Sequence, residues 1–492
     1  FKRTSPLKRQ SWGLHLLAGH DGENCENHTG RAVTDHRRSV LLAVFLSVVL
    51  LVGACRLGES DPQPGADGIG DAYAPQLGNG GYDVQAYDLD LVWDDVTNLL
   101  SGRASIEAIA TMDLSAFNLD FYGFEVRDVT VNGMPSTFSR EGQELTIAPH
   151  EAIRAEQPFT VEIGYRGVPE VWPDRVGGVT SGWMAEEGAV AVPPFSSAGW
   201  FPSNDHPRDK ALFNLRLTVP KPLDVVASGT LVETIDNGDT TTFAWRTEDV
   251  VFMPTVAIDD FDSRALKGPG DLPIDIHFKA GNAEARDAAD QAEGIEDILT
   301  FYGERFGPVP FEAYHLVLHE TMSEVAFSLH TTSVIRREVF ADSVLAHELA
   351  HQWFGNSVSP HSLEDMWLLE GFATYAEALW VEHTTGEDIL VSYYDLIRTM
   401  GPPGSPPIDN IYDHSIYGRG AWTLKALHAR LGDDPFFDLL RAYTDRYRHG
   451  VASTADYIAL AEEVSGEDLG TFFDEWLYGE VMPSVPGLFA ED

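Results

Sequence analysis

The stretch Leu345–Asn356 reads LAHELAHQWFGN, and it raises the question of whether its two histidines form a metal site. His347 and His351 are four positions apart, and Glu348 follows the first histidine directly. Four residues of an α-helix turn through about 400°, so histidines at this spacing lie on one face, one turn apart. The stretch therefore predicts a helix that presents two imidazoles side by side.

We expect this helix to cover residues 341–354. Asp342 or Ser343 can cap its start, because a short polar side chain accepts hydrogen bonds from the free backbone N–H groups there. Gly355 can end it, since glycine readily takes the left-handed conformation that follows many helices.

Two imidazoles at this separation can hold zinc, which needs a third protein ligand and, for catalysis, an open position for water. The best candidate is Glu370, nineteen residues after His351 in DMWLLEGFATYAEALWVEH, residues 365–383. Apolar residues flank this glutamate, and burying a carboxylate among them without a cation is costly. We therefore predict His347, His351 and Glu370 as the ligands of one Zn²⁺ ion.

Glu348 is offset from His347 by about 100° around the helix, so it does not point straight at the metal. It can instead accept a proton from metal-bound water as a general base. Glu377, two turns beyond Glu370, can accept a hydrogen bond from a ligand imidazole, although an ordinary solvated glutamate is an equal alternative. The His-Glu-x-x-His pattern alone often marks an exposed helix face; Glu370 is what favours a metal site.

The apolar periodicity divides the chain into two halves. From Tyr82 to about Asp262 apolar and polar residues alternate, with turn residues between the runs, as in antiparallel β-sheet. Beyond Gly281 the period lengthens toward that of a helix, and Lys267-Gly268-Pro269-Gly270 breaks the chain between the halves. We expect helices at residues 284–304, 341–354, 365–382, 420–431 and 435–447. The predicted fold class is α+β, with an antiparallel β domain before a mostly α domain.

Residues 37–55 read RRSVLLAVFLSVVLLVGAC, two arginines followed by a short apolar run that ends in a cysteine. A run this short with a small-residue end predicts a secretory signal peptide rather than a membrane-spanning helix. The ending is similar to a bacterial lipobox, in which Cys55 is lipidated. Residues 1–36 contain no Met, and we interpret them as a non-native or disordered extension before a start near Val33.

The chain of 492 residues has a net charge of −44, with 33 Lys and Arg against 77 Asp and Glu. Its length predicts two domains. Its charge repels nucleic acid and gains nothing from anionic lipid headgroups, so we interpret it as a solvated surface that aids solubility. The only cysteines, Cys25 and Cys55, exclude a framework of several disulfides.

HELAHQWFGN, with EGFA beginning nineteen residues after His351, resembles the aminopeptidase N family of zinc metallopeptidases, the gluzincins. The likeness covers roughly residues 80–480. Further matching motifs are GWFP at 199–202, DHP at 205–207, DKA at 209–211, IYGRG at 416–420 and FFDEWLYG at 472–479.

The resemblance implies that His347, His351 and Glu370 bind zinc and that Glu348 is the base. It also implies that the Tyr417 hydroxyl donates to the oxyanion of the tetrahedral intermediate, a role that suits a phenol. Tyr412 is the competing candidate, because only the residues after Tyr417 match the family. The implied second domain is a thermolysin-like, mostly α zinc-peptidase domain.

Two departures from the family pattern concern specificity. The family binds the substrate's amino terminus with a glutamate in a Gly-Ala-Met-Glu-Asn-type segment. The counterpart here is residues 321–325, TMSEV, which keeps Glu324 but not the glycine and asparagine. His330, six residues on, is a second candidate to line the cleft, and Leu369 stands where the family usually has Asn.

The sequence thus predicts an extension (1–36), a lipoprotein-type signal peptide (37–54), a flexible tether (55–81), a β domain (82–265), a catalytic domain (266–482) and a tail (483–492). The predicted function is zinc-dependent peptide hydrolysis by an aminopeptidase, through metal-activated water. The alternatives are an endopeptidase of similar chemistry and a catalytically idle zinc-fold binding lipoprotein. We expect peptide substrates, no nucleic-acid partner, a monomer, and a lipid anchor at Cys55 on the outer face of the bacterial cell membrane.

Overall fold

The structure, a computed structural model, describes residues 61–169, 171–173, 180–185, 188–193, 195, 197–320 and 326–484. They belong to one compact unit, Asp61–Asp492. The predicted extension and signal peptide, with Cys55, lie outside the described residues. Within the described ranges, every helix is too short or too polar to span a lipid bilayer.

The largest sheet of the N-terminal half contains eight strands. In β2, Tyr82–Asp94, buried and exposed side chains alternate along nearly the whole strand, as a period of two predicts. Its pairs are antiparallel except for β2 with β13 (Leu212–Pro220), which run parallel. The strand order is β15 (Thr230–Asp236), β16 (Thr240–Arg246), β13, β2, β3 (Leu99–Ala110), β9 (Pro158–Gly167), β5 (Glu125–Val131) and β6 (Met134–Pro135).

Two smaller sheets complete this half, and the apolar faces of the sheets share one hydrophobic core. One sheet has the order β1 (Gln63–Pro64), β4 (Leu114–Asp120), β8 (Glu144–Ala148) and β7 (Thr137–Glu141). The other has the order β10 (Val171–Pro173), β11 (Thr180–Met184), β12 (Ala189–Val192), β17 (Val256–Asp259) and β14 (Asp224–Ala227).

The predicted flexible tether is wrong for its described part, residues 61–81. Its strand β1 pairs in parallel with β4. Ala74 and Leu77 are only 3% and 2% exposed and belong to the hydrophobic core of the helical half. The glycines that suggested flexibility instead permit tight turns, as the positive φ of 66° at Gly78 shows. This segment therefore packs against both halves of the chain.

A five-stranded sheet opens the second half. Its order is β18 (Phe261–Lys267), β19 (Pro273–Lys279), β20 (Tyr314–His319), β22 (Thr332–Arg336) and β21 (Ala326–Leu329). The boundary predicted after residue 265 is therefore wrong by several residues, because β18 already pairs with β19. The Gly-Pro-Gly break is the turn of this hairpin, where the Gly268 N–H donates to the Leu272 carbonyl at 2.8 Å.

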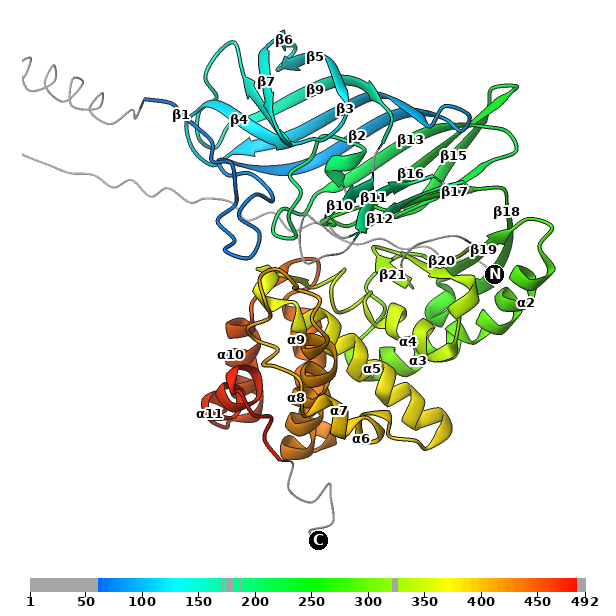
Figure 1. Cartoon of the computed structure of the whole chain (residues 1–492), viewed down its shortest axis with the longest axis vertical. Helices are drawn as coiled ribbons and strands as arrows, with labels where there is room; N and C mark the ends of the chain where they lie inside the picture. The colour runs from blue at the N-terminus through cyan, green and yellow to red at the C-terminus, as the bar shows by residue number, and fades with distance from the viewer. Residues whose placement is uncertain are drawn as a thin grey trace, which may run out of the picture. The chain divides into compact units, whose positions relative to one another are not determined.

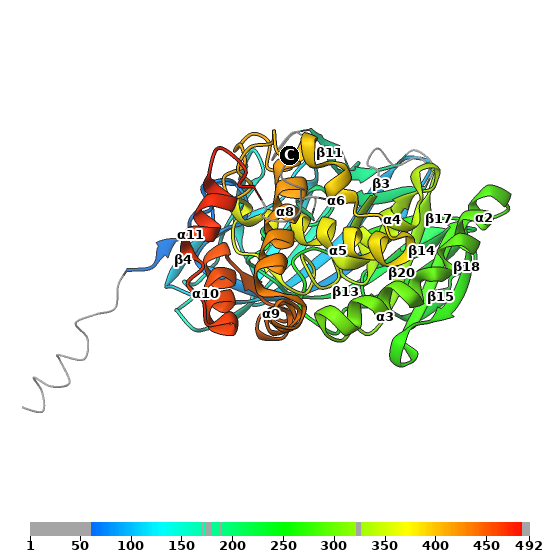
Figure 2. The same ribbon diagram turned by 90° about the horizontal axis from the view of Figure 1, so that it is seen from below.

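Most of the remaining chain is helical (Figures 1 and 2). The short strands β23 (Ser359–Pro360) and β24 (Val451–Ala452) pair in parallel within it. The helices are α2 (Ala283–Gln291), α3 (Ile295–Phe306), α4 (Asp342–Ala350), α5 (Trp367–Thr385), α6 (Ile389–Ser392), α7 (Tyr394–Ile397), α8 (His414–Leu431), α9 (Asp433–Arg446), α10 (Thr454–Ser465) and α11 (Gly470–Phe473).

The five predicted helices are present, with three differences. The helix predicted at 341–354 ends at Ala350 with His351 as its C-cap, so Gly355 does not end it. The stretch predicted at 284–304 is divided between α2 and α3, and α8 begins six residues before the predicted 420. Gly418 and Gly420 argue against a helix by propensity. Gly420 is tolerated because α8 packs closely on α5: the Cα of Gly371 lies 3.1 Å from where a Cβ on Gly420 would be. Gly418 faces another neighbour, since a Cβ there would lie 3.0 Å from the sulfur of Met400.

Figure 1 shows the N-terminal sheets on one side of the described unit and the helices on the other. Each half has its own hydrophobic core. Val317 of β20 and Val334 of β22 pack into the core of the N-terminal sheets, so the five-stranded sheet joins the two cores. The predicted α+β fold class, with a β domain followed by a mostly α domain, is confirmed.

Candidate metal centre

α4 and α5 carry the predicted ligands. His347 lies on α4, His351 directly follows it with φ −60° and ψ −19°, and Glu370 lies in the first turn of α5. The predicted caps at Asp342 or Ser343 are wrong, because the N-cap is Ala341 and its side chain makes no capping bond.

Gly355 marks the turn that leads the chain away from the α4 region. Its φ of 121° favours glycine. A Cβ there would lie only 2.8 Å from the Leu369 side chain. The turn therefore requires glycine for two reasons, conformation and space.

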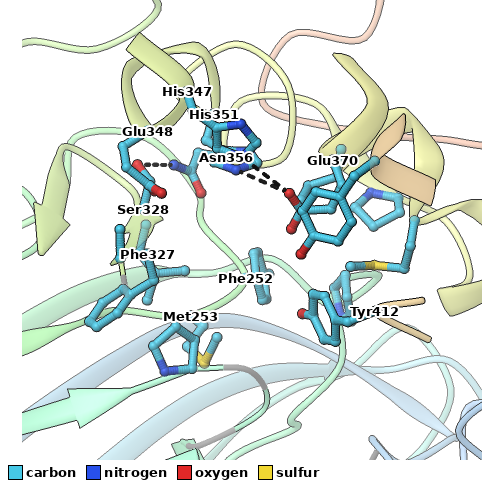
Figure 3. Close-up of a pocket in the computed structure, with 18 of the residues that line it drawn as sticks. Phe252, Met253, Phe327, Ser328, His347, Glu348, His351, Asn356, Glu370 and Tyr412 are labelled. Carbon is cyan, nitrogen blue, oxygen red and sulfur yellow. Dashed lines mark hydrogen bonds and ion pairs between the residues drawn. The ribbon is translucent and has the colours of Figure 1, made fainter. Parts of the chain in front are cut away.

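The three predicted ligands converge (Figure 3). Oε2 of Glu370 lies 3.3 Å from Nε2 of His347 and 3.5 Å from Nε2 of His351. Around a tetrahedral zinc ion with bonds of about 2.0–2.1 Å, neighbouring ligand atoms lie about 3.4 Å apart. The donor set and its spacing therefore fit one zinc ion.

The outer nitrogen of each imidazole has an acceptor. Nδ1 of His347 lies 3.4 Å from Oε2 of Glu377, and Nδ1 of His351 lies 3.1 Å from the Phe354 carbonyl oxygen. When each Nδ1–H donates to its acceptor, the Nε2 lone pairs are left for a metal. Glu377 thus lies where a partner of a ligand imidazole is needed.

The electrostatics of the cluster also call for a cation. Burial alone would lower the pKa of His347, but hydrogen bonds to Glu370 and Glu377 raise it to about 10. Burial alone would raise the pKa of Glu370, but His351 and His347 lower it to about 2. The carboxylates of Glu370 and Glu377 thus favour a proton on the His347 imidazole. A zinc ion supplies that positive charge and leaves both imidazoles neutral.

Glu348 lies beside the ligands, and its side chain has an oxygen without a partner. The residue is 5% exposed, and Oε2 accepts no hydrogen bond from the described residues. Burial raises the pKa of this carboxyl group. A buried oxygen of this kind suits a group that accepts a proton from a bound molecule.

Both candidate tyrosines line the same cavity. The Tyr417 ring lies nearly parallel to the His347 ring, at 22° and 6.3 Å between centroids. Burial, then the charge of Glu370, holds the pKa of Tyr417 well above its ordinary value of 10. Its hydroxyl is therefore protonated at neutral pH and can donate. The contact with His347 places Tyr417 beside the ligands and favours it as the donor.

The cavity has a volume of about 430 Å³ and takes walls from both halves of the chain. Figure 3 shows Phe252, Met253 and Phe327 across the cavity from the imidazoles. Its charged lining residues, among those the structure describes, are Glu348, Glu370 and Glu377, with no Lys or Arg. The cavity is thus mostly apolar, with its acidic groups gathered at the ligands.

Two family domains match the chain. Residues 84–255 match the Peptidase M1 N-terminal domain, and residues 312–476 match the Peptidase family M1 domain. The chain belongs to peptidase family M1. The resemblance to the aminopeptidase N family is thereby confirmed.

Two M1 relatives of this chain are longer proteins. Probable aminopeptidase 2 of Sulfurisphaera tokodaii is 27% identical over 321 residues, which is 58% of this chain and 40% of that protein. Aminopeptidase M1 of Arabidopsis thaliana is 24% identical over 447 residues, 81% of this chain and 50% of that protein. This chain therefore spans half or less of the length of these relatives.

Solved M1 structures match at nearly their full length. A two-domain M1 zinc metallopeptidase variant bound to L-arginine has a TM-score of 0.78 and 27% identity, covering 86% of this chain and 100% of that one. The M1 zinc metallopeptidase from Deinococcus radiodurans has a TM-score of 0.75 and 27% identity, covering 85% and 99%. With the ligand cluster found here, these likenesses identify zinc as the cofactor of this M1 chain.

The two candidate substrate-binding residues have different outcomes. Glu324 lies outside the described residues. His330 does not line the cavity, so that prediction is wrong. Its side chain is 1% exposed and packs on the Phe311 ring at 4.1 Å between centroids. The tight turn between β21 and β22, where Thr331 has a φ of 56°, carries His330 away from the cleft.

Part of the M1 site was not found in the sequence. Pro193, Phe195, Pro207, Phe252 and Met253 of the N-terminal half line the cavity. Of these, only Pro207 lies in a motif that the sequence analysis singled out. The others reach the site through tertiary packing, which leaves no local pattern in the sequence.

Proposed function

We propose that this M1 chain is a zinc-dependent aminopeptidase that hydrolyses the peptide bond next to a free amino terminus. The observation that carries the proposal is the convergence of His347, His351 and Glu370 beside the unpartnered oxygen of Glu348. The cavity around them is large enough for a few residues of a peptide.

A zinc ion held by His347, His351 and Glu370 supplies Lewis-acid polarisation of the scissile carbonyl and of a water molecule. Glu348 accepts the proton of the attacking water and passes it to the leaving amine. The surrounding protein fixes this carboxylate, since its residue is almost completely buried.

Tyr417 donates its hydroxyl hydrogen to the carbonyl oxygen as negative charge develops there. It lies one helical turn before Gly420, where α8 is tightly packed on α5, so the rigid helix pair holds the donor relative to Glu370. Glu377 holds His347 in the tautomer that leaves Nε2 free.

Glu324 anchors the ammonium group of the substrate in this proposal. The support is its place in the chain: Ala326, two residues later, begins β21 and lines the cavity. The three described glutamates of the cavity already have other roles. An ammonium group needs a carboxylate that is not engaged by a histidine or the metal.

The test is a panel of peptides with free and acetylated amino termini, assayed with purified zinc-loaded protein. We expect the free peptides to be cleaved stepwise from the amino end and the acetylated ones to resist. Faster cleavage of acetylated peptides at internal bonds would show an endopeptidase instead.

Glu348→Gln separates an enzyme from an idle zinc-binding protein. We expect the variant to keep stoichiometric zinc and to lose at least about 10²-fold in kcat, because the proton acceptor is gone. Glu382→Gln, an exposed change on α5, is the matched control and should be fully active. A wild-type protein that binds zinc and cleaves no peptide would support the binding lipoprotein.

We also propose that the protein is exported and lipid-anchored through Cys55 on the outer face of the bacterial membrane, as a monomer. The support for the anchor is the sequence of residues 37–55 alone. We expect the full chain to fractionate with membranes and Cys55→Ser to appear in the soluble fraction. Equal membrane association of both would contradict the anchor, and a dimer in sedimentation would contradict the monomer.

A further inference from the structure

The relative position of the zinc ligands depends on the segment between them. We call residues 352–366 the connector, because they join His351 to the helix that carries Glu370. Asn356, Pro360 and Met366 of the connector also line the cavity. Any movement of the connector therefore changes both the ligand geometry and the wall of the cleft.

Lys210 of the N-terminal half donates hydrogen bonds to the first part of the connector. Its Nζ donates to the carbonyl oxygens of Asn356 at 3.0 Å and Ser357 at 2.9 Å. It also donates to the Gly450 carbonyl at 3.2 Å, just before β24, which pairs with the connector strand β23. One ammonium group thus satisfies three backbone carbonyls and fixes the chain that leaves His351.

Asp71 accepts hydrogen bonds from the last part of the connector. Its carboxylate accepts hydrogen bonds from the Ser362 hydroxyl at 3.0 Å and from the Leu363 N–H at 2.9 Å. Ser362 is the N-cap of the short helix Leu363–Asp365 that leads into α5. The Asp71 side chain is fully buried. A buried carboxylate with these donors fixes the start of the helix that carries Glu370.

The contacts of Asp71 and Lys210 with the connector are linked by further hydrogen bonds. The Nε2 of His206 donates to Asp71 at 3.1 Å, because its Nδ1 accepts from the Arg208 N–H. Arg208 in turn donates from Nε to the His361 carbonyl at 3.0 Å and from Nη1 to the Ile69 carbonyl at 3.2 Å. Residues 206–210 thus touch the first part of the connector directly, and its last part both directly at His361 and through Asp71.

We propose that Asp71 and Lys210 are positioning residues for the metal centre. They hold the two ends of the connector, and so set the separation of His351 and Glu370, although neither touches zinc or substrate. The inference rests on the proposed zinc site. It assigns to Asp71 in the segment 61–81, and to Lys210 in the DKA motif at 209–211, a role in the geometry of a site that lies in the other half.

The experiment compares Asp71→Asn and Lys210→Met with matched controls in the full chain. Asp236→Asn and Lys221→Met remove an exposed pair of the same residue types, 70% and 41% exposed, in the same half. Zinc release is followed with a chromophoric chelator well below the melting temperature. Amide hydrogen exchange of residues 361–372 is measured in the metal-free protein.

We expect Asp71→Asn and Lys210→Met to release zinc about tenfold faster, the lower end of the effect of removing partners of metal ligands. Exchange at 361–372 should rise in Asp71→Asn and stay unchanged in both controls. A lower melting temperature with unchanged zinc release would show a merely structural role and overturn the proposal.

Ser362→Ala covers the case in which Asp71→Asn does not fold, because it removes one of the hydrogen bonds to Asp71 together with the cap bond that the hydroxyl accepts from the Glu364 N–H. A smaller acceleration of zinc release is expected, and zinc release equal to that of wild type would contradict the role of Asp71. The zinc readout is independent of peptidase activity. If wild-type protein cleaves no peptide, the proposed function is wrong. The zinc release of these variants still tests the positioning role in that case.

Discussion

Gly371→Ala should separate the effect of helix packing on catalysis from its effect on stability. Gly371 directly follows Glu370, and a Cβ there would lie 2.9 Å from the Ile416 carbonyl oxygen and 3.0 Å from the Gly420 Cα. Non-bonded carbon atoms prefer about 3.5–4.0 Å. α5 and α8 must therefore move apart by roughly 0.5 Å at their closest approach.

The cost in stability is modest. Overpacking costs about 1–3 kcal/mol, and replacing glycine by alanine in a helix returns about 1 kcal/mol. We expect a net loss of at most about 2 kcal/mol in the free energy of unfolding. Activity should fall as well, because the shift acts directly on Glu370 and, across the contact, on Tyr417. A misplacement of about 1 Å costs about 10²-fold in rate, so half of it predicts about tenfold in kcat/KM.

Gly303→Ala on α3 is the matched control. A Cβ there meets nothing within 4 Å, so the same substitution should raise stability by about 1 kcal/mol and leave activity unchanged. Urea unfolding and peptide hydrolysis on both variants provide the assay. Full activity in a folded Gly371→Ala, or an equal loss in Gly303→Ala, would refute the reasoning.

Three further outcomes are expected. Burial lowers the pKa of His277 to about 3 and of His315 to about 4, so below pH 6.5 the unfolded chain binds more protons than the folded one. The contribution of each histidine to the free energy of unfolding is then complete above pH 6.5, and it falls toward pH 4 by up to about 1.4 kcal/mol per pH unit. In urea titrations the free energy of unfolding of His277→Gln should fall less steeply with decreasing pH than that of wild type, and an equal steepness would contradict this. Tyr417→Phe should lower kcat about 10²-fold with little change in KM, and Tyr412→Phe should lower it far less; the reverse order would exchange their roles. Phe327→Asp should depress kcat/KM for leucyl and phenylalanyl peptides more than for arginyl ones, because the wall is apolar, and equal losses would exclude Phe327 from side-chain recognition.

The ligand set could be predicted because its information is local. Two histidines four apart on a helix share a face whatever the rest of the chain does. Glu370 in an apolar helix needs a cation for reasons of charge alone. The alternation along β2 and the longer period after Gly281 likewise identified the two halves.

The errors arose where position depends on partners distant in sequence. Composition made residues 61–81 look like a tether, but nothing near Asp71 shows that its hydrogen-bond donors lie at Ser362 and Leu363. His330 was placed in the cleft from its distance to Glu324, and a tight turn at Thr331 sends it elsewhere. The hairpin at Gly268 looks like a break between the halves in the sequence, because a Gly-Pro-Gly run occurs both in hairpin turns and between domains.

The contact between Asp71 and Leu363 also constrains how the protein is made. Its two partners are separated by 292 positions, so the first is synthesised long before the second leaves the ribosome. Until then the Asp71 carboxylate stays in water, because the segment that buries it has not yet been made. High contact order of this kind slows folding. The first half must therefore stay soluble until Leu363 is in place, a task for which abundant negative charge is well suited.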